Sequence, residues 1–177
     1  MESVIYKNEA CELCEDFMDV GYMAENFEAC NIGDETLEIK RSRPERGMSI
    51  FVTFPSFDEE FGAEILKIDM LLAELEIDVA CYLIFNEKTD ALELLSPKLK
   101  KFTILIDHEE DFGNMYGTKI ISGSLKDKLT KSLFLISKDG SVFYVDMPKD
   151  LDTLIDLERL RIELNKAYVT YTGKGCH

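Results

Sequence analysis

The spacing of apolar residues changes along this chain and divides it into two kinds of segment. Continuous apolar runs, typical of strands buried on both faces, occur at 48–54, 78–85, 102–106 and 132–137. Residues 58–76 instead carry apolar side chains at spacings of three and four, which predicts an amphipathic helix. Buried strands that alternate with helices predict an α/β sheet covered on both sides.

Shorter patterns complete the predicted order. Short helices are expected at 90–95 and 109–116, and a strand at 141–147 is expected to pair with 132–137 around an Asp-Gly turn. A long final helix is expected at 150–168, with an apolar face made of Leu151, Leu154, Ile155, Leu157 and Leu160. Near the N-terminus the pattern predicts a hairpin of 3–6 with 10–18, then two strands at 26–30 and 36–40.

Composition narrows the function classes. Hydrophobic residues make up 46% of the 177 residues and charged residues 31%, which is typical of a soluble globular domain. The net charge of −15 argues against nucleic acid and anionic membranes as partners, because both require a basic protein face. A basic surface on a protein partner would be compatible with this charge.

Several absences bear on location. The first residues show no basic segment followed by an apolar one, and no apolar run approaches the ~18 residues of a membrane span. The five cysteines are an odd number at irregular spacing. We therefore expect a cytoplasmic protein with reduced thiols. We expect no cofactor.

The most informative segment is the junction between the strand that ends at Phe54 and the helix that follows. It reads Phe51-Val-Thr-Phe-Pro-Ser-Phe-Asp-Glu-Glu-Phe-Gly62. It resembles the active-site loop of peroxiredoxins of the thiol peroxidase subfamily, Pro-Ser-x-Asp-Thr-x-x-Cys. Pro55, Ser56 and Asp58 fit this pattern.

Collinear matches extend the resemblance over nearly the whole chain. Asp111 to Gly117 resembles the family's Asp-Phe-x-x-x-Tyr-Gly segment, and 123–126 followed by 131–136 resembles a Gly-Pro-Leu-x stretch and its strand. The resemblance implies one thioredoxin-like domain of peroxiredoxin type over 1–177. It also implies an N-terminal β-hairpin extension at 1–20, a flexible tail at 169–177 and a homodimer.

The departures from the family fall on its catalytic positions. Peroxiredoxins use a Cys thiolate polarised by Thr and Arg and shielded by Pro. Of these only Pro55 is kept, since Glu59 stands at the Thr position, Gly62 at the nucleophile and Lys131 at the Arg. No cysteine lies near 93–94, where the resolving Cys is expected. We therefore predict that the peroxidase chemistry is lost and that the protein is a binding or regulatory module.

An alternative keeps thiol chemistry but moves it elsewhere. Cys11 and Cys14 form a Cys-x-x-Cys, and Cys176 lies in the polar tail, so a thiol-dependent oxidoreductase or antioxidant protein could use these residues. On a strand, however, residues three apart point to opposite faces, which disfavours a disulfide. Neighbouring carboxylates such as Glu12 would also raise the thiol pKa values.

Two further expectations concern metals and aromatic side chains. Cys11, Cys14 and Cys30 could form a zinc site with a histidine, but we expect no metal and interpret the acidic run 107–111 as a solvated loop. Phe57 and Phe61 flank the active-site loop. One or both are expected in a dimer interface, unless Phe61 turns inward as core.

Overall fold

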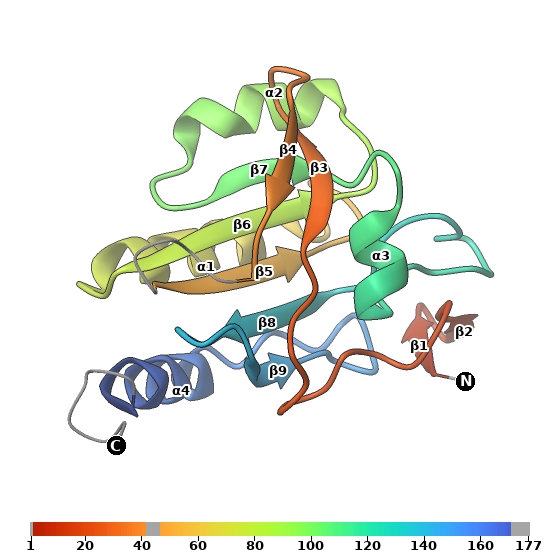
Figure 1. The fold of residues 1–177 in the computed structure, drawn as a ribbon. Helices are drawn as coiled ribbons and strands as arrows, with labels where there is room; N and C mark the ends of the chain where they lie inside the picture. Colours follow the sequence, from red (N-terminus) through yellow and green to blue (C-terminus); the bar gives the residue numbers. More distant parts are fainter. Residues whose placement is uncertain (1, 42–46, 171–177) are drawn as a thin grey trace.

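The computed structural model describes residues 2–41 and 47–170. A seven-stranded sheet with strand order β4-β3-β7-β6-β5-β8-β9 forms the centre, and β1 and β2 form a separate hairpin (Figure 1). The strands are β1 Ser3–Tyr6, β2 Glu9–Glu12, β3 Phe27–Asn31, β4 Thr36–Ile39, β5 Met48–Thr53, β6 Val79–Phe85, β7 Thr103–Ile106, β8 Ser132–Ile136 and β9 Val142–Asp146. The helices are α1 Gly62–Glu74, α2 Asp90–Leu95, the short 3₁₀ helix η1 Ser96–Lys98, α3 Asp111–Tyr116 and α4 Leu157–Thr170.

Parallel pairing in the middle of the sheet fixes where the loops lie. Strands β5, β6 and β7 are parallel, and β8 and β9 continue the sheet antiparallel on one side. On the other side β3 pairs antiparallel with β7 and β4 pairs with β3. The carboxyl ends of β5 and β6 therefore lie side by side, which is where α/β sheets place their sites.

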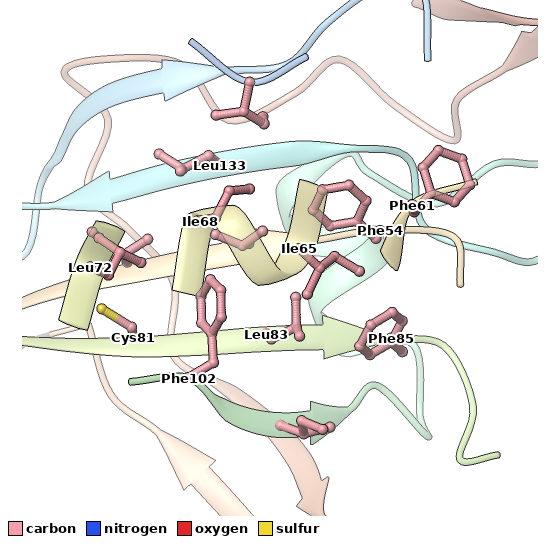
Figure 2. Close-up of a cluster of buried hydrophobic side chains, with 14 of the residues drawn as sticks. Phe54, Phe61, Ile65, Ile68, Leu72, Cys81, Leu83, Phe85, Phe102 and Leu133 are labelled. Carbon is pink, nitrogen blue, oxygen red and sulfur yellow. The ribbon is translucent and has the colours of Figure 1, made fainter. Parts of the chain in front are cut away.

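Alternate residues of each central strand face opposite sides of the sheet, as the pleat requires. In β5, Ile50 and Val52 face one cluster of buried side chains, whereas Phe51 faces another. Helices α1, α2 and α4 contribute to the first cluster, in which Ile65 and Ile68 of α1 lie over the strands (Figure 2). Helix α3 contributes to the second cluster. These observations confirm the predicted α/β sheet covered on both sides.

Three predicted helices begin later than expected: α3 by only two residues, at Asp111, and α1 and α4 by several residues. Helix α1 begins at Gly62 and not at 58, because Asp58 caps a preceding turn by accepting from the backbone N–H groups of Glu60 and Phe61 at 2.9 and 3.3 Å. Helix α4 begins at Leu157 and not at 150. Directly before Leu157, Asp156 Oδ1 accepts from the N–H of Arg159 at 3.0 Å and caps the helix. Side-chain caps of this kind compete with helix extension.

The segment before α4 is not helical, so its apolar residues do not form one helix face. Leu151 and Ile155 are buried, but Leu154 is exposed. This segment is bound to the first strand, since Ile5 N–H donates to Lys149 O at 2.7 Å and Leu151 N–H donates to Ile5 O at 2.9 Å. The predicted strand 10–18 is also shorter than expected and ends at Glu12.

Among the described residues, no helix combines the length and apolar character needed to cross a membrane.

Candidate functional site

The loop between β5 and α1 lies at the carboxyl end of β5 and is held by its own polar side chains. Pro55, two residues after the end of β5, is buried. Ser56 Oγ donates to Asp58 Oδ2 at 2.7 Å, and the carbonyl of Asp58 accepts from the N–H of Gly62 at 2.8 Å. The loop therefore delivers Gly62 to the first position of α1.

Gly62 is buried and offers no side-chain atom to a reactant. A Cβ at this position would lie 3.3 Å from Cε1 of Phe57, so the ring of Phe57 covers this position. Phe57 itself is partly buried against the core. Phe61 is only 4% exposed and packs with its ring centroid 5.8 Å from that of Phe54 (Figure 2). The inward alternative for Phe61 is the one observed.

Lys131, directly before β8, is 1% exposed and fully engaged inside the protein. Its Nζ lies 2.6 Å from Glu64 Oε1 and donates to the backbone oxygen of Thr153 at 2.8 Å. The rings of Phe54 and Phe61 have their centroids 5.7 Å from the same Nζ. A buried charge requires such partners. Here the carboxylate of Glu64 already neutralises the charge of Lys131, which leaves no unpaired cation for an external anion.

Glu64 connects this cation to the segment before α4. While Oε1 faces Lys131, Oε2 accepts from the N–H of Ile155 at 2.7 Å. Burial raises the pKa of the nearby Asp146 carboxyl, and the negative charges of Asp156 and Glu64 raise it further. The charge of Lys131 and the hydrogen bond from the N–H of Asp156 act in the opposite direction. The result is an internal polar cluster that fastens α1, β8, β9 and the 147–156 segment together.

The other predicted residues are not brought into this cluster. Glu59 is exposed on the turn before α1 and makes no hydrogen bond or ion pair with another described residue. Glu64 was not among the predicted site residues, because the helical pattern presents it as an ordinary polar position. One feature of the sequence could have indicated such a partner: Lys131 directly precedes the apolar run 132–136. A lysine buried next to a core strand requires a carboxylate partner.

Cys11, Cys14 and Cys30 are free thiols in separate environments. Cys11 is buried on β2, and burial, followed by the charge of Glu9, raises the pKa of its thiol. Cys14 follows β2 with its Sγ 3.3 Å from the backbone oxygen of Gly113, and burial raises its pKa too. Neither thiol lies at a helix N-terminus, where a thiolate would be stabilised. Cys176 lies outside the described residues.

Within residues 2–41 and 47–170, no three His, Cys, Asp or Glu side chains are arranged to hold a metal ion. Cys11, Cys14 and Cys30 therefore do not form a zinc site with one another. The acidic run 107–111 is not wholly solvated as expected. Asp107 is buried and accepts from the N–H groups of Phe112 and Gly113 at 2.9 and 2.8 Å, which anchors the start of α3. Burial nevertheless raises the pKa of Asp107.

A cavity of about 230 Å³ opens beside the β5–α1 loop. Its walls come from that loop, from the end of β6, from α2 and from one lysine near β8. The lining residues are Pro55, Ser56, Phe57, Phe85, Asn86, Glu87, Thr89, Ala91, Leu92 and Lys128. Lys131 and Glu59 do not line it, so the cation and the cavity are separate features of the same region.

Comparison with solved structures identifies this arrangement as a peroxiredoxin fold. A peroxiredoxin-like protein from Aquifex aeolicus has a TM-score of 0.85 at 19% identity, with 94% of this chain and 98% of that chain covered. A thiol peroxidase from Chromobacterium violaceum has a TM-score of 0.81 at 18% identity over the same shares. The mitochondrial 2-Cys peroxiredoxin from Plasmodium falciparum has a TM-score of 0.65 at 17% identity, covering 90% of this chain and 100% of that chain.

The sequence matches no protein-family model and no curated protein.

Proposed function

We propose that this protein is a thiol-peroxidase-like protein without the peroxidatic cysteine and acts as a non-catalytic binding or regulatory module. The observation that carries the proposal is Gly62 at the first position of α1 in a peroxiredoxin fold, with the ring of Phe57 over it. Peroxide reduction by this fold requires a thiolate nucleophile, and glycine supplies none.

The surrounding charges support the same proposal. A low-pKa thiolate requires a nearby cation that is free to stabilise it. Lys131 is paired with Glu64 and hydrogen-bonded to Thr153, so its charge is already satisfied. Asp58 holds the turn before α1 and Pro55 is buried beside it, while no nucleophile stands at Gly62 and the charge of Lys131 is occupied.

A peroxidase assay tests the proposal. The full chain is given hydrogen peroxide or an organic hydroperoxide with a thioredoxin system, and NADPH consumption is followed. We expect no turnover above the protein-free control. Rapid turnover that survives replacement of Cys11, Cys14 and Cys176 would overturn the proposal. Rapid turnover that these replacements abolish would favour the thiol-dependent oxidoreductase instead.

We also propose a homodimer in a reducing, cytoplasmic setting. The free thiols of Cys11, Cys14 and Cys30 support the reducing setting. With Phe61 buried, the partly buried ring of Phe57 is the aromatic group of this loop that remains for an interface. Sedimentation velocity at high micromolar concentration tests the assembly, and a monomer there would refute the dimer.

A further inference from the structure

We propose that the cavity beside α2 binds a small, uncharged, mainly apolar molecule that carries one hydrogen-bonding group, such as an aryl or alkyl alcohol. This inference rests on the proposed function, because it assigns a ligand to a protein proposed to bind and not to catalyse. It adds the ligand's size, charge and orientation, each argued from the lining residues below.

The position and size of the cavity set the kind of molecule. Pro55 follows β5 and Phe85 ends β6, so the cavity lies at the carboxyl ends of two adjacent parallel strands. Its volume of about 230 Å³ exceeds the ~150 Å³ that encloses a benzene ring and falls below the ~300 Å³ where drug-sized sites begin. One ring with a short polar arm fits this range.

The apolar walls favour a ring or chain inside the cavity. Phe57 and Phe85 contribute aromatic surface, Pro55 closes one side, and Ala91 and Leu92 of α2 close another. Phe85 is buried in the core and cannot swing away, so the wall on the β6 side is preformed (Figure 2). Burial of apolar ligand surface against such walls drives binding.

The polar lining residues determine which head group is accepted. Ser56 already donates to Asp58, and Thr89 Oγ1 already accepts from the N–H of Leu92 at 3.3 Å. The side chain of Asn86, in contrast, makes no hydrogen bond with another described residue although it is partly buried and lines the cavity. Its amide offers two donors and one acceptor, which suits a hydroxyl group.

The charges at the rim argue for an uncharged ligand. Lys128 Nζ lies 3.9 Å from Glu87 Oε1, so the only lysine and the only carboxylate of the lining oppose each other. An anion would face Glu87 and a protein of net charge −15, and a cation would face Lys128. Because Lys128 and Glu87 already pair with each other, neither an anion nor a cation finds an unpaired opposite charge at the rim.

The test uses three probes that share a phenyl ring and differ in charge: 2-phenylethanol, phenylacetate and phenethylamine. Each is titrated into the ¹⁵N-labelled full chain, and amide shifts of the lining residues are followed. We expect 2-phenylethanol to bind at least tenfold more tightly than either charged probe. Tighter binding of phenylacetate or phenethylamine would overturn the head-group assignment, and no shift at the lining residues with any probe up to 10 mM would overturn the site.

Two variants locate the contact. Ala91→Phe fills the cavity and is expected to abolish the shifts, whereas Ala73→Phe makes the same change at an exposed position of α1 and is expected to leave them intact. Asn86→Ala is expected to weaken 2-phenylethanol binding about fivefold, as the loss of one hydrogen bond would. Unchanged binding in Ala91→Phe would overturn the site. The peroxidase assay is read independently, so failure here and failure of the proposed function are distinguishable.

Discussion

The two faces of the central sheet are built from different chemistry. On the α3 face, Phe27, Phe51, Phe112, Tyr116 and Phe134 pack ring against ring, with Phe112 and Tyr116 stacked at 4.2 Å. The α1 face is largely aliphatic over the strands, but at the end of β5 it holds a buried ion pair and an adjacent open cavity. The α3 face is therefore held by ring packing, whereas the α1 face combines aliphatic packing with a buried charge pair beside a cavity.

The strongest test of the aromatic face is Phe112→Ala. The ring is fully buried and contacts four other rings, so its removal leaves a cavity that rigid neighbours cannot fill. We expect the free energy of unfolding to fall by about 4 kcal/mol in urea titrations. Leu66→Ala, at an exposed position of α1, is the control and is expected to change it by less than about 0.5 kcal/mol. A loss below about 1 kcal/mol for Phe112→Ala would erase the contrast between the faces.

The matching test of the other face is Lys131→Met. This change leaves the carboxylate of Glu64 buried without its cation, and we expect the free energy of unfolding to fall by about 3 kcal/mol. The double variant with Glu64→Gln removes the orphaned charge and keeps an acceptor for the N–H of Ile155. It is therefore expected to recover at least half of the loss. If the double variant were less stable than Lys131→Met, the pairing would not explain the buried lysine.

The pH dependence of stability sharpens the picture of the polar cluster. Because the pKa of Asp146 is raised in the folded state, the folded protein binds this proton more readily than the unfolded chain. Stability contributed by this group is therefore lost as pH rises from its ordinary pKa of about 3.9 through the raised value. Asp146→Asn keeps an acceptor for the N–H of Asp156. Relative to the parent protein, it is expected to gain stability across this pH window.

Unfolding free energies measured by urea titration at several pH values check this expectation. Asp152→Asn, at an exposed position, serves as the control and is expected to follow the parent curve. A parallel curve for Asp146→Asn would show that the folded state does not perturb Asp146.

The smallest expected effect belongs to Gly62→Cys. The introduced thiol would meet the ring of Phe57, and the nearby cation is already paired with Glu64. We expect its pKa to stay at or above the reference value of about 8.5, with no gain in peroxide reduction. Titration of iodoacetamide reactivity against pH measures it. A pKa well below 8.5 would mean that the α1 face still carries a working thiolate site.

The fold was largely predictable because its buried strands are continuous apolar runs, and 78–85 and 132–137 became β6 and β8 almost unchanged. The ends of elements were less predictable. Asp58 and Asp156 act as caps that shorten two helices, and apolar spacing alone does not reveal a cap. Residues 151–156 are a similar case. Leu151 and Ile155 are buried in a non-helical segment, and their spacing resembles that of a helix face.

The candidate site was predictable at its loop and not in its interior. Pro55 and Gly62 lie where the sequence pattern implied, at the junction of strand and helix. The pairing of Lys131 with Glu64 joins residues distant in sequence, and it depends on how β8 packs against α1. The cavity is a property of shape. No pattern of residue types along the chain describes the space that Phe57, Phe85 and α2 leave between them.

The hydrogen bonds between Ile5 and the 149–151 segment have a consequence for synthesis on the ribosome. The first strand leaves the ribosome long before the 149–151 segment to which it is bound. β3 likewise waits for β7, with which it pairs at Cys30 and Ile106. Such distant pairings slow folding, because loop closure must precede the contacts. During synthesis, β1 and β3 are therefore expected to stay without these long-range partners until β7 and the 149–151 segment have been made.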